Sequence, residues 1–242
     1  MKVNVLILAA GNVGFETKDG GYPLCLTEFD GIALIERLVS TSCKIKDAVY
    51  TFALRGEDVA RYHLDNIVEL LVDRPEVISV PEMSKGAACT ALVAACRFDP
   101  EAEVLIVSAN ELVDVSLDEI IEGFRERGLD AGALTFRSIH PRYSYVRIDD
   151  NGFVVEAAQQ NPITQHATTG VFWFARAGDF VEGVKNMIRK DAVVGGNFYI
   201  APVFNELILN QKKVGVCEID PKVYHPLKTE RQVYQFQQEG VV

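Results

Sequence analysis

The stretch Val3-Asn4-Val5-Leu6-Ile7-Leu8-Ala9-Ala10-Gly11, close to the start of the chain, decides the fold. Its nearly continuous apolar run is rich in β-branched residues, which is typical of a strand buried on both faces of a sheet. A polar, glycine-rich segment then reaches Gly31, and apolar residues recur at helical spacing at Ile32, Ile35 and Val39. The predicted order is a central strand, a long loop and a helix.

Strands and helices continue to alternate as far as Ala131. Strands are predicted at 47–54, 76–80 and 103–108, and helices at 57–71, 86–95 and 116–128. The buried face of the helix 57–71 is expected to contain Val59, His63, Ile67 and Leu70. Ser116 and Glu119 have the spacing of a capping box. This order predicts a doubly wound, largely parallel sheet.

Beyond Ala131 the pattern changes to antiparallel strands. Residues 143–148 and 153–157 alternate in polarity and are joined by the turn sequence Asp149-Asp150-Asn151-Gly152. A strand at 168–175, helices at 180–188 and 198–210, and a strand at 213–218 are predicted after them. The sequence therefore predicts one α/β domain over 1–242, Rossmann-like and doubly wound, with a mixed sheet and an added antiparallel hairpin.

Composition narrows the classes of function. The 242 residues are 48% hydrophobic and carry a formal net charge of -10, so a packed domain is expected and a nucleic-acid partner is not. No apolar run is long enough to cross a membrane. Five scattered cysteines, without closely spaced pairs, are typical of reduced and buried thiols. A cytoplasmic location is expected.

Ligands of open α/β sheets bind at the carboxyl ends of the strands. Gly11 and Gly14 follow the first strand directly, where backbone N–H groups can approach a phosphate or a base. The segment matches neither the dinucleotide-binding glycine pattern nor a P-loop. Taken alone, these two glycines are better explained by an ordinary tight turn.

Longer segments, taken in order, make a stronger signal. They are Leu8-Ala9-Ala10-Gly11, Tyr22-Pro23-Leu24-Cys25-Leu26, Lys85–Thr90, Val107–Glu111, His140–Tyr145, Asn161–Ile163, Ala167–Phe174 and Phe198–Leu207. In order and spacing this series resembles the sugar-phosphate nucleotidyltransferases, in particular a branch found among capsule and surface-glycan biosynthesis proteins. The resemblance covers nearly the whole chain.

The resemblance implies a reaction between a nucleoside triphosphate and a sugar 1-phosphate that releases pyrophosphate, with Mg²⁺ bridging the phosphates. It implies a nucleotide-binding half at 1–135 and a sugar-binding half at 136–242. The implied nucleotide-binding residues are Ala9, Ala10, Gly11, Asn12, Gly14, Gly86, Ala87 and Asn110. The implied sugar-binding residues are Tyr145, Gln159, Gln160, Thr169 and Gly170.

The chain departs from the family pattern where that pattern is charged. Phe15 stands at the arginine position, Leu24 at the lysine position and Asn110 at the metal-binding aspartate position. The family's Glu-Lys pair corresponds to Gln159-Gln160, and the segment Tyr224–Thr229 lacks a second aspartate. Removing one preorganised charge commonly lowers a rate by about 10²- to 10³-fold. The interpretation is a protein of surface-polysaccharide or nucleotide-sugar metabolism that binds a nucleotide or nucleotide-sugar, with weak or absent transfer activity.

The alternative is an active Mg²⁺-dependent enzyme that uses substitute charges. Lys18, Lys85 and Arg55 are the candidate cations. Glu111 and Asp114 are candidate metal ligands beside Asn110, although an extended chain through Asn110 would turn Glu111 to the opposite face unless a turn redirects it. Mg²⁺ is expected only if the protein is active. A homo-oligomer and an active homologous partner both remain open.

Overall fold

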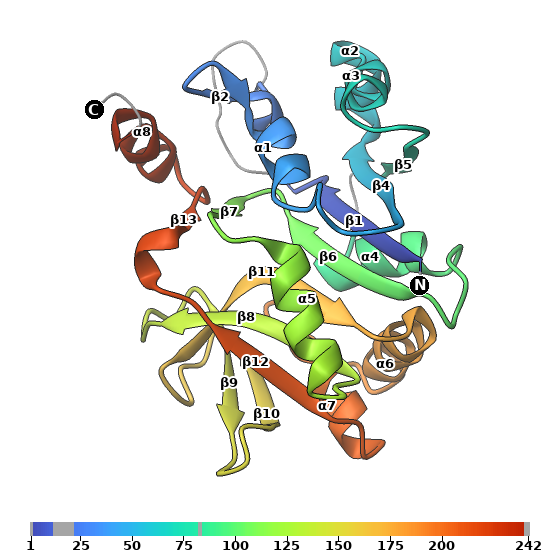
Figure 1. The fold of residues 1–242 in the computed structure, drawn as a ribbon, viewed down its shortest axis with the longest axis vertical. Coiled ribbons are helices and arrows are strands. Elements are labelled where there is room, and N and C mark those ends of the chain that lie inside the picture. Colours follow the sequence, from blue (N-terminus) through green and yellow to red (C-terminus); the bar gives the residue numbers. More distant parts are fainter. Residues whose placement is uncertain (1, 12–21, 82–83, 240–242) are drawn as a thin grey trace.

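The buried strand at the start of the chain lies inside a large mixed sheet (Figure 1). The computed structural model describes residues 2–11, 22–81 and 84–239. In these residues the strands are β1 (Val3–Ala9), β2 (Glu28–Phe29), β3 (Ile32–Ala33), β4 (Ala48–Arg55), β5 (Glu76–Val80), β6 (Glu103–Ser108), β7 (Glu111–Val113), β8 (Ala131–Arg137), β9 (Ser144–Ile148), β10 (Val154–Gln159), β11 (His166–Phe174), β12 (Val214–Glu218) and β13 (Tyr224–Pro226).

Helices occupy most of the segments between these strands. They are α1 (Leu34–Ser40), α2 (Gly56–Tyr62), α3 (Leu64–Leu71), α4 (Ala87–Ala95), α5 (Leu117–Glu126), α6 (Ala177–Arg189), α7 (Val203–Leu209) and α8 (Glu230–Glu239), with short 3-10 turns η1 (Leu24–Leu26) and η2 (Pro221–Val223).

The strands of the large sheet change from parallel to antiparallel pairing in the middle of the sheet. Its order is β10-β9-β11-β6-β1-β4-β5, and β8 joins β11 on one side and β12 on the other. Strands β6, β1, β4 and β5 are parallel to one another, whereas β11 is antiparallel to β6, β8 and β9. The carboxyl ends of the parallel strands therefore meet at one edge, which β11 adjoins.

Both faces of the sheet are covered, as the doubly wound prediction requires. Val5 and Ile7 of β1 face a core shared with α1, α3 and α5, whereas Leu6 and Leu8 face a core shared with α4, α6 and α7. This alternation follows from the two-residue period of a strand. The predicted mixed α/β sheet and the hairpin of β9 and β10 are confirmed.

A buried carboxylate joins β6, β11 and α5. Glu103 is 1% exposed, and its two carboxylate oxygens accept hydrogen bonds from Nε and Nη2 of Arg125 at 3.0 and 2.9 Å. The indole N–H of Trp173 also donates to Glu103, at 2.9 Å. A charge removed from water is tolerated when it is paired and fully hydrogen-bonded, and this arrangement meets both conditions.

Several local predictions were wrong. The helix expected over 57–71 is two helices, because His63 adopts a left-handed conformation with φ of 51° and ends α2. His63 is exposed and Leu70 is 86% exposed, whereas Leu64 and Val68 are the buried residues of α3. Val59 and Ile67 are partly buried against the core as expected, so the helical period identified the helices and half of their predicted buried face.

Other boundaries also differ from the sequence prediction. Ile32 lies in β3 rather than in a helix, and the helix expected from residue 198 begins only at Val203. No capping box forms at α5, because the Ser116 hydroxyl donates to Asp118 and caps no backbone N–H. Cys43 and Cys96 are exposed rather than buried.

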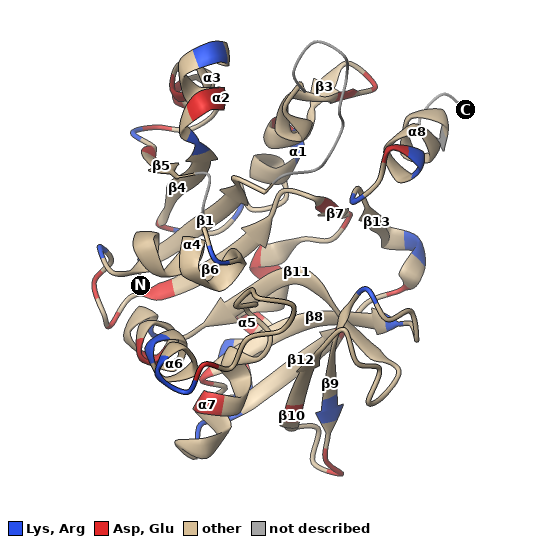
Figure 2. Cartoon of the chain, turned by 180° about the vertical axis from the view of Figure 1, so that it is seen from behind, with Lys and Arg blue, Asp and Glu red and all other residues tan. Residues whose placement is uncertain are grey.

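The distribution of charge and the lengths of the helices are relevant to two partners that the composition makes unexpected, nucleic acids and membranes. Figure 2 shows Lys and Arg interspersed with Asp and Glu over helices and loops, with no broad basic region in this view of the described residues. Across the same described ranges, no helix combines the length and apolar composition needed to cross a bilayer.

Removing the cation from the Glu103 cluster tests its contribution to stability. We expect Arg125→Leu to lower the free energy of unfolding by about 2 to 3 kcal/mol, because a buried carboxylate then keeps only the Trp173 N–H. Urea unfolding followed by circular dichroism measures the change.

The matched control is Arg189→Leu, which removes an arginine from the exposed pair with Glu182. We expect a change within about 0.5 kcal/mol there. Equal losses in the two variants would show that the Glu103 cluster is no more important than a surface ion pair.

Candidate functional site

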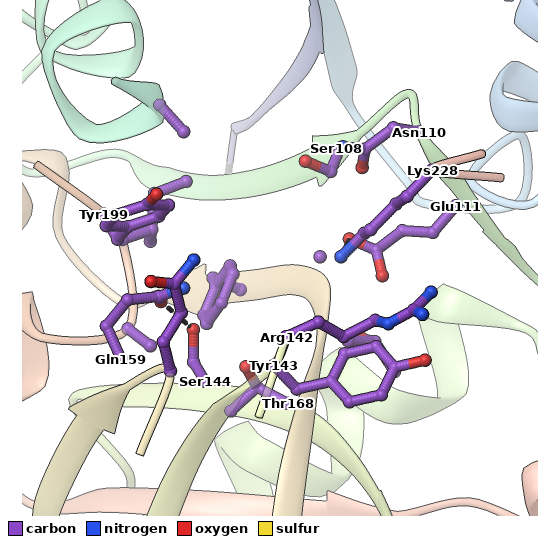
Figure 3. A pocket seen from close by; sticks show the side chains of 17 residues that line it. Ser108, Asn110, Glu111, Arg142, Tyr143, Ser144, Gln159, Thr168, Tyr199 and Lys228 are labelled. Carbon is purple, nitrogen blue, oxygen red and sulfur yellow. Dashed lines mark hydrogen bonds and ion pairs between the residues drawn. The ribbon is translucent and has the colours of Figure 1, made fainter. Parts of the chain in front are cut away.

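A cleft of about 230 Å³ opens where the parallel strands end and β11 crosses beside them (Figure 3). Its walls come from the end of β6, the start of α4, the strands β9 to β11, the loop before α7 and the segment after β13. The lining residues are Ala87, Ser108, Asn110, Glu111, Arg142, Tyr143, Ser144, Gln159, Gln160, Thr168, Thr169, Gly170, Phe172, Tyr199, Ile200, Ala201 and Lys228.

A turn at the end of β6 directs Glu111 into this cleft. Residues 109 and 110 form the turn, and it is held because the Ala109 N–H donates to the Leu8 carbonyl at 2.9 Å. The Leu227 N–H donates to the Asn110 carbonyl at 2.9 Å from the other side. The chain is therefore not extended through Asn110, and Glu111 reaches the cleft by the turn that the sequence analysis left open.

The Glu111 carboxylate is only 4% exposed and has two polar partners. Its Oε2 accepts a hydrogen bond from the Tyr224 hydroxyl at 2.5 Å, and its Oε1 lies 3.4 Å from Nζ of Lys228. Burial, and next the charge of Glu111, raise the pKa of Tyr224 well above its usual range. Tyr224 therefore stays protonated at neutral pH and remains a hydrogen-bond donor to the carboxylate.

Glycine at position 170 leaves the space that the carboxylate fills. A Cβ atom on Gly170 would overlap Oε1 of Glu111 and Cβ of Ser108, and would lie 2.8 Å from Cδ of Glu111. Real Cβ atoms do not approach other heavy atoms so closely. Gly170 was predicted to bind sugar, and its observed contact is with Glu111.

Two cations in the cleft escaped the sequence analysis. Lys228 lies 5.4 Å above the centre of the Tyr143 ring, and Arg142 lines the same side of the cleft (Figure 3). Both stand in segments already compared with the family, His140–Tyr145 and Tyr224–Thr229. The sequence therefore did contain a signal, because Lys228 stands in the segment that lacks the family's second aspartate.

The predicted sugar-binding residues gather at the strands β9 to β11. Gln159, Gln160, Thr169 and Gly170 all line the cleft. The Ser144 hydroxyl donates to the Gln159 side chain and orients it. Tyr145 is fully buried behind the cleft, and its hydroxyl donates to the His140 carbonyl at 2.6 Å. Tyr145 therefore supports the loop that carries Arg142.

The predicted nucleotide-binding residues divide into three groups. Ala87 and Asn110 line the cleft, and Gly86 precedes Ala87 with φ of +98° and is packed tightly against the Phe198 backbone. Ala9, Ala10 and Gly11 lie at the end of β1 and are not among the described lining residues. Asn12 and Gly14 lie outside the described residues, as do Phe15 and Lys18.

The remaining candidate charges lie elsewhere. Lys85 is exposed and does not line the cleft, and Arg55 forms an ion pair with Glu57 at 3.1 Å. Asp114 pairs with His225 at 2.8 Å, and this hydrogen bond lowers the pKa of the Asp114 carboxyl. Leu24 is buried in the hydrophobic core, so a lysine there would have to be accommodated among apolar side chains.

The described cleft residues do not fit a divalent cation held by side chains alone. No group of three or more His, Cys, Asp or Glu residues suited to a metal occurs in the described ranges. Asn110 Oδ1 is buried and accepts no hydrogen bond from a described residue, so it is an available oxygen ligand. Glu111, the one carboxylate among the described lining residues, is already paired with an ammonium group. Mg²⁺ strongly prefers carboxylate and other oxygen ligands and is repelled by a nearby cation.

Comparison with known proteins places the fold. No protein-family model matches the sequence, and no curated protein does. The nucleoside-diphosphate-sugar pyrophosphorylase from Vibrio cholerae RC9 superposes with a TM-score of 0.80 and 19% identity, over 97% of this chain and 99% of that one. The CMP:2-keto-3-deoxy-manno-octonic acid synthetase complexed with CTP gives a TM-score of 0.71 with 10% identity, over 100% and 99% of the two chains.

A third solved structure agrees with these two. The inositol-1-phosphate CTP transferase from T. maritima superposes with a TM-score of 0.70 and 15% identity, over 98% of this chain and 95% of that one. At such low identities the likeness shows the fold alone. The chain therefore has the fold shared by nucleotide-sugar pyrophosphorylases and related nucleotidyltransferases.

Replacing the glycine beneath Glu111 tests the packing of the cleft. We expect Gly170→Ala to lower the free energy of unfolding by about 1 to 3 kcal/mol, because the added methyl group overlaps Glu111 and Ser108. Chemical denaturation measures this loss.

Gly123→Ala is the matched control, because a Cβ atom at this position of α5 meets nothing within 4 Å. There we expect a gain of about 0.5 to 1 kcal/mol from the greater helix propensity of alanine. An unchanged stability of Gly170→Ala would contradict the close contact with Glu111.

Proposed function

We propose that the cleft binds a nucleotide or a nucleotide-sugar, and that the protein transfers nucleotidyl groups weakly or not at all. The observation that carries this proposal is the charge of the cleft. Among the described lining residues, the charged ones are the cations Arg142 and Lys228 and the anion Glu111, whereas the whole chain has a net charge of -10. An excess of positive charge in a hollow of an acidic protein favours a phosphorylated ligand.

The other lining residues suit the remaining parts of such a ligand. Gln159, Gln160 and Thr169 offer amide and hydroxyl groups that can hydrogen-bond to sugar hydroxyls. Tyr199 adds an aromatic ring on the side of the cleft where Gln159 lies, across from Lys228 and Arg142 (Figure 3). We therefore assign the nucleotide to the half 1–135 and the sugar to the half 136–242, with the phosphates between them near Lys228.

Weak transfer is proposed because the charges for phosphoryl chemistry are few. Leu24 offers nothing to a phosphate, and Asn110 is neutral. Nucleotidyl transfer depends on placed charges that stabilise the transition state, and each missing one costs about 10²- to 10³-fold in rate. The alternative, an active enzyme, gains some support from Arg142 and Lys228, which could replace part of the lost positive charge.

From the resemblance to the family, we also propose a role in surface-polysaccharide metabolism, a cytoplasmic location, and a second copy of the chain or an active homologous protein as a partner.

Binding measurements test this proposal directly. Calorimetry with each common nucleoside triphosphate and with UDP-glucose should detect binding of at least one of these compounds. We expect Arg142→Met to weaken that binding by about tenfold or more, because it removes a charged donor from the cleft. Arg147→Met is the control, since Arg147 is exposed and pairs with Glu156 in the hairpin away from the cleft lining. Absence of binding by the whole panel would refute the proposal.

A pyrophosphate-release assay separates the proposal from its alternative. Each triphosphate is mixed with a panel of sugar 1-phosphates and Mg²⁺. We expect release near the background level, because several stabilising charges are absent. Release at rates typical of enzymes, about 1 to 10³ per second, would select the active enzyme instead.

A further inference from the structure

We propose that Lys228 takes the place of a divalent cation, so that the cleft binds a phosphate or diphosphate group without Mg²⁺. The nature of the complete ligand rests on the proposed function, but the anion site itself is argued from the cleft residues. Three features lead to this inference: the fixed position of Lys228, the unused N–H donors of its ammonium group, and the two partners that already contact the Glu111 carboxylate.

The backbone fixes the position of Lys228. Strand β13 pairs with β7 so that Pro226 lies opposite Glu111, and the Leu227 N–H donates to the Asn110 carbonyl at 2.9 Å. Lys228 follows directly and is thereby held beside the turn at the end of β6. Its own N–H donates to the side chain of Gln232 at 3.1 Å, at the start of α8. The lysine is therefore anchored on both sides by hydrogen bonds.

The ammonium group has donors to spare. A lysine ammonium has three N–H donors, and the described partner for Nζ is Glu111 Oε1, at 3.4 Å. The side chain is 29% exposed and lines the cleft, so its other donors are accessible to a ligand. Arg142 lines the same cleft, where its Nε donates to Nδ1 of His140 at 3.3 Å, and no acid in the described ranges forms an ion pair with it, so no carboxylate neutralises its charge. A phosphate group bound here would meet two cations.

Glu111 holds the lysine rather than leaving room for a metal. One of its oxygens accepts a hydrogen bond from the Tyr224 hydroxyl, and the other faces the ammonium group. Gly170 packs directly against the carboxylate. A divalent cation at this carboxylate would have to displace Lys228 or sit next to its charge. Either change loses a favourable interaction or adds a repulsion. The carboxylate therefore acts as the counter-charge that orients Lys228.

Inorganic pyrophosphate is a suitable probe, because it contains the proposed anionic group and neither base nor sugar. We expect calorimetry on the full chain to detect pyrophosphate binding in excess EDTA. Lys228→Met should weaken this binding by about ten- to a hundredfold, since it keeps the length of the side chain and removes the charge. Lys222→Met is the matched control, because Lys222 is exposed on η2 in the same segment of the chain. This control should bind pyrophosphate like the unmodified protein.

Glu111→Gln distinguishes the two roles of the carboxylate by the sign of its effect. If Glu111 only orients Lys228, the substitution removes a negative charge and should tighten pyrophosphate binding in EDTA. If Glu111 is a metal ligand, pyrophosphate should bind only with Mg²⁺ and the substitution should weaken it. This variant keeps a hydrogen-bond acceptor for Tyr224, so it also remains informative should Lys228→Met fail to fold.

Each outcome decides the inference and leaves the proposed function separately testable. Binding in EDTA that Lys228→Met weakens supports the inference, even if no nucleotide binds. Absence of pyrophosphate binding, binding that requires Mg²⁺, or equal losses in Lys228→Met and Lys222→Met would overturn it. Mg²⁺-dependent binding of a nucleotide would then still support the proposed function.

Discussion

The antiparallel pairing of β6 with β11 is the constraint on which the rest of the structure depends. It joins a parallel set of strands to an antiparallel set, and side chains secure the pair near both ends. At one end Glu103 links Arg125 and the Trp173 indole inside the core. At the other end Gly170 makes room for the Glu111 carboxylate. The first contact stabilises the junction of sheet and helix, and the second places a charged group in the cleft that forms beside it.

The two buried carboxylates show how the same chemical group can serve different purposes. Glu103 is satisfied by donors from the protein alone and lies away from the cleft, so its role is structural. Glu111 has a protonated tyrosine on one oxygen and a partly exposed lysine near the other. The ammonium group of this lysine therefore keeps N–H donors that its ion pair with Glu111 does not use and that are accessible from the cleft. In the complex that we propose, a ligand with negative charge would complete this arrangement without disturbing the buried part.

The position of positive charge matters more here than its total amount. The chain is acidic as a whole, yet the described residues that line its cleft include two cations and one anion. Charges in a hollow act through a lower effective dielectric than charges on an open surface, so two well-placed cations can attract an anion despite many exposed carboxylates. Binding requires only this attraction, whereas nucleotidyl transfer requires further groups aimed at charge that develops during the reaction. This difference is the reason why we propose ligand binding with weak or absent transfer for this cleft.

By itself the sequence determined the class of fold, because buried strands, helical periods and turn residues are local patterns, and because ordered segments along the whole chain resemble one family. It also identified Asn110, Gln159, Gln160 and Thr169, which the structure brings together in one cleft. Only the tertiary structure decided the direction of Glu111, since a two-residue turn held by contacts from β1 and from the segment after β13 sets that direction. The positions of Lys228 and Arg142 in the cleft were likewise decided by the tertiary structure. They are far from Glu111 in the sequence, and their approach depends on strand pairings and loop packing that no local pattern encodes.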